Sequence, residues 1–143
     1  MTIAAILRQK GSAVTEVSPT ALISDVAILL SDRRIGAVLV RDTAQQLMGI
    51  VSERDIVHSL ARHGGEALQM TAGQLMTRNL QTATPSTTVA EAMALMTTGR
   101  FRHLPVLDHG ALVGLISIGD VVKSRIEQQA QEVDSLKAYV AGA

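Results

Sequence analysis

Apolar positions along the first half of the chain alternate between extended and helical spacing. Val14–Val17 has the pattern of a short strand, Leu22–Leu30 carries apolar residues at helical spacing, and Ile35–Val40 is an apolar run bounded by charged residues. A polar turn leads into the strand pattern Leu47–Val51, after which helical spacing resumes and ends at Gly64. The pattern predicts the order strand, helix, strand, strand, helix.

The second half of the chain repeats this order. The lead-in Thr71–Met76 resembles Thr2–Leu7, Pro85 stands where Pro19 stands in the first half, and the strand pattern returns at His103–Leu107. A period of about 65 residues is too long for a solenoid unit, and a three-stranded half buries too little apolar surface to be stable alone. We therefore expect an α/β fold in which two similar half-domains pack around a pseudo-twofold axis.

Each half contains a turn where an apolar run closes on a serine that is followed three residues later by an aspartate. These pairs are Ser52 with Asp55 and Ser117 with Asp120. A helix is expected to begin there, so its first amides favour an anion, and the carboxylate suits the vicinal hydroxyls of a ribose. Helix capping explains either copy taken alone. Because the pair recurs in a matched context, we favour a binding site that is present twice.

Composition restricts the class of protein. Apolar residues make up 47% of the chain, yet Phe101 and Tyr139 are its only aromatic residues, so the core must be aliphatic. Thirteen basic and thirteen acidic residues cancel without forming charged runs, which argues against a nucleic-acid or membrane partner. Without cysteine, disulfides and thiolate chemistry are excluded. The apolar run Thr2–Leu7 is too short for a signal peptide and no stretch is long enough to span a membrane, so we expect a cytoplasmic protein.

No catalytic or metal-binding pattern stands out. The glycines form neither G-x-G-x-x-G nor G-x-x-x-x-G-K-[ST], which argues against a dinucleotide fold and a phosphate loop. His58 and His63 fall on or after a polar helix face, where exposure is a better explanation than metal ligation. No nucleophile elbow is present, and the methionines are expected to fill the core. We expect a protein that is not an enzyme and holds no metal.

Three segments carry a resemblance to a known family. They read Gly-Ile-Val-Ser-Glu-Arg-Asp-Ile-Val (Gly49–Val57), Phe-Arg-His-Leu-Pro-Val (Phe101–Val106) and Gly-Leu-Ile-Ser-Ile-Gly-Asp-Val-Val (Gly114–Val122). Together they resemble the CBS domain, a module named after cystathionine β-synthase that occurs in tandem pairs. The resemblance covers Thr2–Arg125. It predicts a first repeat with its lead-in helix at residues 1–65, a second repeat at 66–125 and a C-terminal helical extension at 126–143.

The resemblance implies two βαββα units and two related clefts for an adenosine-containing ligand, with AMP first and ADP, ATP, NAD or S-adenosylmethionine as alternatives. Asp55 and Asp120 match the family's ribose-binding aspartates, and Ser52 and Ser117 match its hydroxyl residues. The other implied site residues sandwich the base or lie near the lead-in strands. They are Ile35, Gly36, Ala37, Val38, Phe101, Leu104 and Pro105, with Thr15 and Thr82 as weaker candidates.

The two implied clefts differ in charge and backbone. Arg102 and His103 stand where the first copy has glycine and alanine, so a positive or donor group lies near a phosphate in the second cleft. Arg54, a candidate phosphate contact in the first cleft, is matched by Gly119. Pro105 removes an N–H from its strand, whereas the first copy has leucine there. We expect the clefts to differ in phosphate preference, or only one to be well occupied.

The C-terminal tail carries an apolar seam. Its positions follow alternating steps of four and three residues, the spacing of a coiled-coil core, and they are Val122, Ile126, Gln129, Val133, Leu136 and Val140. One interpretation folds this helix back on its own domain, for example on Thr2–Leu7. The other pairs it across a homodimer, in which the helices after Ser52 and Ser117 also associate and Gln129 helps to fix the register.

These observations lead to one functional expectation with two alternatives. We expect a regulatory module that binds an adenine nucleotide, senses energy or redox state, and acts as a homodimer on an unidentified regulated protein. A ligand can regulate only by binding one arrangement of the protein better than another. The first alternative is a protein–protein interaction scaffold with degenerate ligand clefts. The second is a nucleotide-processing enzyme, which no catalytic group encourages.

Overall fold

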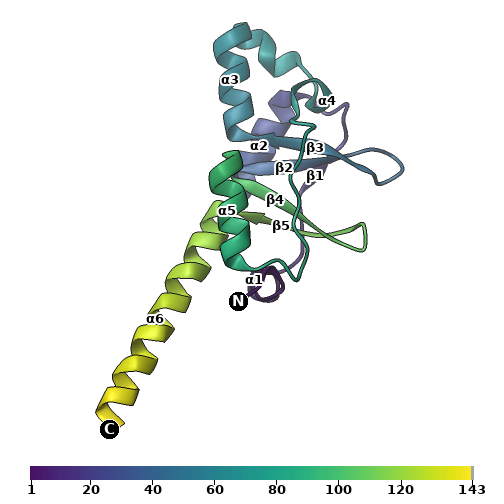
Figure 1. Cartoon of the computed structure of the whole chain (residues 1–143). Coiled ribbons are helices and arrows are strands. Elements are labelled where there is room, and N and C mark those ends of the chain that lie inside the picture. The colour runs from purple at the N-terminus through teal and green to yellow at the C-terminus, as the bar shows by residue number, and fades with distance from the viewer. Residues whose placement is uncertain (143) are drawn as a thin grey trace. The chain divides into compact units, whose positions relative to one another are not determined.

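The computed structural model describes residues 1–142, and its mixed helices and strands confirm the α/β class (Figure 1). The order helix, strand, strand, helix occurs in both halves, and the first half has a further strand in front of it. In chain order the elements are α1 (Ile3–Lys10), β1 (Glu16–Val17), α2 (Ile23–Arg33), β2 (Ala37–Arg41), β3 (Leu47–Ser52), α3 (Glu53–His63), the 3-10 helix η1 (Gly64–Gln69), α4 (Ala72–Leu75), α5 (Val89–Gly99), β4 (His103–Asp108), β5 (Ala111–Ser117) and α6 (Ile118–Gly142).

The chain forms two compact units, each with its own aliphatic core. One unit is Val14–Leu80, and the other combines Met1–Ala13 with the chain from Gln81 onward. In the first unit, β1 pairs in parallel with β2, and β2 pairs antiparallel with β3. Its core residues are Ile23, Val26, Leu30, Val38, Val40, Val51, Ile56, Ala72 and Met76. In the second unit, β4 pairs antiparallel with β5, and the core residues are Ile3, Ile6, Ala83, Val89, Ala92, Met96, Leu104, Val106, Ile116 and Val121.

The lead-in helices are exchanged between the halves of the sequence. Helix α1 precedes the first repeat but packs with the second, where the Ile3 amide donates to the Thr87 carbonyl oxygen at 2.9 Å. Helix α4 precedes the second repeat but packs with the first, where the Ala72 amide donates to the Ala21 carbonyl oxygen at 2.8 Å. The contacts therefore group the lead-in helix with residues from 81 onward, whereas the predicted boundaries group it with residues 1–65.

The lead-in strand differs between the two units because of one proline. In the first unit the Leu39 amide donates to the Thr15 carbonyl oxygen at 3.0 Å, which secures β1 against β2. Pro105 occupies the matching position in β4 and has no N–H to donate. The lead-in there makes only an isolated bridge between Ala83 and Val106. The predicted third strand of the second half is thus reduced to a bridge.

Helix α6 is one continuous helix that begins at the Ser117 turn and runs past the end of its own unit's core. Its first turns contact α1, and the Ser124 hydroxyl lies against the sulfur of Met1, just before that helix. Residues 129–142 are all exposed, so folding back on the Thr2–Leu7 helix does not describe this half of the helix (Figure 1). Residue 143, the last of the predicted extension, lies outside the described residues. Within residues 1–142, no helix combines the length and apolar character needed to cross a membrane.

Candidate functional site

The Ser52 turn connects β3 to α3 and is held by reciprocal hydrogen bonds. The Asp55 amide donates to the Ser52 hydroxyl oxygen at 3.2 Å, and the Ser52 amide and hydroxyl donate to Asp55 Oδ2 at 2.8 and 3.0 Å. This is a capping box, the arrangement that satisfies the first free amides of a helix. Among residues 1–142, no hydrogen bond ends on Oδ1 of Asp55, so one carboxylate oxygen remains for a ligand.

The Ser117 turn repeats this geometry with an added cation. The Asp120 amide donates to the Ser117 hydroxyl oxygen at 3.1 Å, and the Ser117 amide donates to Asp120 Oδ2 at 2.8 Å. The Lys10 ammonium also donates to Oδ2, at 2.7 Å, and to the Leu115 carbonyl oxygen at 2.8 Å. Lys10 and Asp120 thus form an ion pair that tethers the end of α1 to the turn.

The Lys10 contact changes the acidity of Asp120. Burial is the largest influence and raises the pKa of this carboxyl, but the hydrogen bonds from Lys10 and from the Ser117 amide, with the lysine charge, outweigh it. The pKa of Asp120 therefore lies below its ordinary value of 3.8. The carboxylate is ionised at neutral pH.

The helix N-termini are less open to an anion than the sequence suggests. The amide of the first helical residue donates to a backbone carbonyl in each turn, Glu53 to Gly36 at 2.9 Å and Ile118 to Arg102 at 2.8 Å. The amide of each aspartate is occupied by the serine. Two of the first three helix amides are thus paired within the protein, so the carboxylates are the more available groups.

Each unit brings part of its predicted site to one sheet end. Ala37 lies opposite Ser52 in the β2–β3 register, and His103 lies opposite Ser117 in the β4–β5 register. The candidate phosphate group Arg102 is next to His103 and is exposed, as is Arg54 in the first turn of α3. The predicted phosphate and ribose contacts of the second turn therefore lie together in one unit.

The strand residues predicted to sandwich a base divide into two sets. Val38 and Leu104 point into the cores of their own units, so their side chains are not free to contact a ligand. Of the others, Ile35 packs against the core of the first unit, and the rest are outside these core clusters. Ala37 and Pro105 are buried, whereas Ile35, Gly36 and Phe101 are half-buried.

The two threonines proposed as weaker candidates are not equivalent. The Thr15 hydroxyl accepts a hydrogen bond from Arg33 Nη1 at 3.2 Å, while Thr82 is exposed. Lys10, by contrast, was not foreseen as a site residue. No sequence pattern links it to Asp120, because α1 reaches this turn only through packing of the folded unit.

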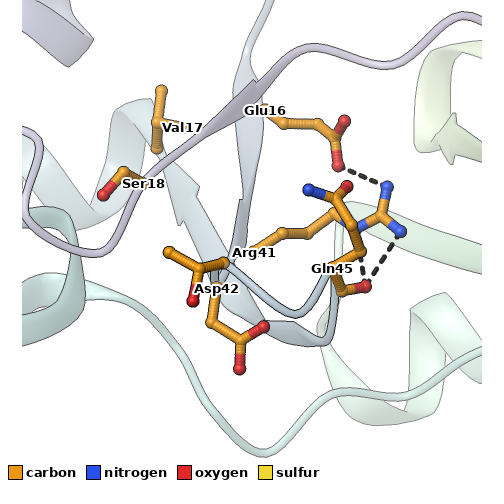
Figure 2. A pocket seen from close by; sticks show the side chains of 7 residues that line it. Glu16, Val17, Ser18, Arg41, Asp42 and Gln45 are labelled. Atoms are coloured by element: carbon orange, nitrogen blue, oxygen red, sulfur yellow. Dashed lines mark hydrogen bonds and ion pairs between the residues drawn. The ribbon is translucent and has the colours of Figure 1, made fainter.

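A hollow in the first unit lies beside β1 and the β2–β3 turn, and none of the predicted site residues lines it (Figure 2). Figure 2 shows the Arg41 guanidinium between Glu16 and Gln45. Arg41 donates to Glu16 Oε2 at 2.6 Å and twice to the Gln45 carbonyl oxygen, at 3.1 and 2.9 Å. The guanidinium is already bonded to protein groups on both sides. We therefore assign its role to holding the hairpin together and not to binding a ligand. The hollow is lined by Glu16, Val17, Ser18, Arg41, Asp42, Thr43 and Gln45.

A second hollow, in the other unit, contains the Lys10–Asp120 ion pair. It lies between α1 and the first turns of α6 and is lined by Ile6, Gln9, Lys10, Asp120, Lys123, Ser124 and Glu127.

Within the described residues, no group of three or more histidines and acidic side chains could hold a metal ion.

Comparisons with known proteins match this duplicated geometry. The family model of the CBS domain matches residues 12–62 and 72–127. The CBS domain-containing protein CBSX3, mitochondrial, of Arabidopsis thaliana is 35% identical over 122 residues, which cover 82% of this chain and 59% of that relative. The chain therefore spans little more than half the length of this relative.

Solved structures of CBS-domain proteins share the fold. The protein ATU1752 from Agrobacterium tumefaciens is 41% identical, with a TM-score of 0.85 over 87% of this chain and 92% of that one. The protein PAE2072 from Pyrobaculum aerophilum, solved as a complex with AMP, is 26% identical, with a TM-score of 0.73 over 84% of this chain and 89% of that one.

Proposed function

The chain belongs to the CBS-domain family, and we propose that it is a regulatory module that binds an adenine nucleotide and catalyses no reaction of its own. The observation that carries this proposal is the duplicated Ser-x-x-Asp turn. In each copy the capping bonds use Oδ2 of the aspartate and leave Oδ1 for a ligand, Asp55 in one and Asp120 in the other. The AMP complex of the similar protein PAE2072 supports an adenosine ligand.

The proposed roles depend on where the side chains lie. Oδ1 of Asp55 or Asp120 accepts hydrogen bonds from the ribose hydroxyls, and Arg102 with His103 contacts the phosphate at the second turn. The base lies against the predicted residues that stay half-buried outside the unit cores, Gly36 at the first turn and Phe101 at the second. The exposed Arg54 offers a phosphate contact at the first turn, where the second has glycine.

AMP is the first ligand to test, because one phosphate suits one pair of donors at the second turn. ADP, ATP, NAD and S-adenosylmethionine share the adenosine that the aspartates would recognise and differ in the group attached to the 5′ carbon of its ribose. We propose that the preference among these ligands lets the protein sense the energy or redox state. Titration of all five compounds in calorimetry would rank them.

The decisive experiment removes the carboxylate charge while keeping the cap. Asp55→Asn and Asp120→Asn retain an oxygen that accepts from the serine amide, but they lose the anionic acceptor for the sugar hydroxyls. We expect AMP affinity in calorimetry to fall at least about tenfold for each aspartate that holds a ligand, which corresponds to about 1.4 kcal/mol. Asp25→Asn, at an exposed position in the first turn of α2, is the matched control.

Two variants that both bind AMP as tightly as this control would refute the proposal. A loss confined to Asp120→Asn would assign the ligand to the second turn alone. Failure of all five compounds to bind the unaltered chain would favour the scaffold alternative, for which the exposed half of α6 offers a surface.

We also propose that the module is a cytoplasmic homodimer. Support for association comes from exposed apolar side chains on the helices after the two serines, with Val57 and Leu60 on α3 and Ile118 on α6. Two subunits can pack in more than one arrangement. A nucleotide that binds one arrangement better than another shifts the dimer toward it, and regulation requires such a difference in affinity. Sedimentation equilibrium of the full chain would test the oligomeric state.

A further inference from the structure

One face of α6 is apolar and uncovered. Its side chains follow the spacing of a coiled-coil core, and their exposed fractions are large: 60% for Ile126, 49% for Val133, 64% for Leu136 and 71% for Val140. Val122 begins the same face at 42% exposure. We call this face the α6 seam and define it by residues 122, 126, 129, 133, 136 and 140. Exposed apolar side chains at such regular spacing indicate a surface that is buried in an assembly.

The α6 seam points away from the helix's own unit. Val121 and Ser124 are the buried residues of α6, at 1% and 5% exposure, and they pack against the core and Met1. At about 100° per residue, the mean direction of the seam lies about 130° around the helix axis from these two residues. A partner can therefore cover the seam without displacing α6 from its unit.

The residue types on the seam favour two strands when the helices pair in parallel. Ile126, Val133 and Val140 fall at the a positions, and Val122 and Leu136 at d positions. Among parallel coiled coils, β-branched residues at a with leucine at d favour two strands. Gln129 is the one polar residue at a core position, and only an in-register pairing lets its amide meet the same amide of a second copy.

The charges beside the seam complement a second copy in the same orientation. Glu132 falls at a g position and Lys137 at the e position five residues later. In a parallel, in-register pair these two side chains face each other across the interface, once on each side. An antiparallel pair sets g against g and e against e, so Glu132 would lose this partner.

We propose that the α6 seam binds the same seam of a second copy of this chain as a parallel, in-register, two-stranded coiled coil over residues 122–140. This inference builds on the proposed homodimer and does not depend on nucleotide binding. The coiled coil would hold two CBS pairs together at their C-terminal helices. The dimer would then have a contact surface that lies outside the repeats.

Cysteine crosslinking tests both the partner and the orientation, because the chain has no cysteine of its own. Gln129→Cys and Leu136→Cys place a thiol at two successive d positions, and Gln131→Cys places a control thiol on an exposed position off the seam. Under mild oxidation of the full chain, we expect both d variants to form disulfide-linked dimers and the control to remain monomeric in denaturing gels. In an antiparallel pair, at most one of positions 129 and 136 can lie opposite the same position of the second copy, within reach of a disulfide. Crosslinking of a single d variant, or of neither, would overturn the proposal.

Association strength gives an independent test. The variant Val133→Glu with Leu136→Glu puts four carboxylates into the interface of a dimer, whereas Gln131→Glu with Ala138→Glu adds the same charge at exposed positions off the seam. We expect the first variant to weaken self-association in sedimentation equilibrium at least about tenfold and the second to leave it nearly unchanged. Equal association of both variants would exclude the coiled coil, while AMP calorimetry on the same samples would still report separately on the nucleotide proposal.

Discussion

A single lysine gives the aspartates of the two similar turns different surroundings. Asp55 and Asp120 make the same bonds to their serine amides, but within residues 1–142 only Asp120 also pairs with an ammonium group, at 2.7 Å from Lys10. At the second turn a ribose would therefore meet a carboxylate already neutralised in part. Among residues 1–142, the carboxylate of the first turn forms no such ion pair, so the two turns differ in electrostatics as well as in their proposed phosphate contacts.

Removing this lysine should produce a pH-dependent loss of stability. Because the pKa of folded Asp120 lies below its ordinary value, its contribution is fully present above pH about 4 and is lost as the pH falls through the folded pKa. The ion pair is partly exposed, with side-chain exposures of 36% and 25%, so we expect Lys10→Ala to cost about 0.5 kcal/mol at neutral pH. Urea denaturation at several pH values measures this difference.

Lys123→Ala is the control, since Lys123 lines the same hollow but forms no ion pair among the described residues. The Lys10 hydrogen bond to the Leu115 carbonyl oxygen adds a loss that does not vary with pH. Only the part that disappears in acid therefore reports on Asp120. A Lys10→Ala penalty that stays constant from neutral pH to below the folded pKa would contradict the assigned ion pair.

At the scale of elements, a glycine in each hairpin lets an exchanged lead-in segment approach the sheet. A Cβ atom at Gly49 in β3 would lie 2.6 Å from the Thr77 carbonyl oxygen and 2.8 Å from the Met76 sulfur. At the matching Gly114 in β5, it would lie 2.6 Å from a terminal methyl of Leu7 in α1. The same close approach thus occurs in both units, with backbone as the obstacle in one and a flexible side chain in the other.

This difference predicts unequal costs for alanine. Gly49→Ala pushes against the backbone oxygen of Thr77, which accepts the Ile50 amide within a β-bridge, so we expect a loss of about 2–3 kcal/mol in the free energy of unfolding. Gly114→Ala displaces only the end of a leucine side chain, and we expect about 1 kcal/mol. Chemical denaturation of both variants decides the order. Greater damage from Gly114→Ala would show that α1 is packed more rigidly than α4.

At the scale of the whole molecule, ligand binding to the folded state should raise its stability. At an AMP concentration about one hundred times the dissociation constant, the gain is about 2.7 kcal/mol, which corresponds to about 8 °C in Tm for a chain of this size. We expect this shift in differential scanning fluorimetry of the unaltered chain. The double variant Asp55→Asn with Asp120→Asn should lose most of it, and an equal shift in that variant would separate AMP binding from the two turns.

The local elements of the fold could be predicted from the sequence. Apolar spacing identified α2, β2, β3 and β4, and the serine and aspartate of each turn marked where α3 and α6 begin. These features depend on residues within a few positions of each other. The a and d spacing along α6 was also readable, because one helix face is a local property of the chain.

Contacts between distant residues were decided by the tertiary structure alone. The exchange of α1 and α4, the ion pair of Lys10 with Asp120 and the direction of Val38 and Leu104 into their own cores all join segments far apart in the chain. No periodicity encodes such a contact, since it depends on how whole elements pack. The sequence by itself therefore determined a duplicated α/β chain with two capped turns and an apolar tail helix, whereas packing decided which side chains surround each turn.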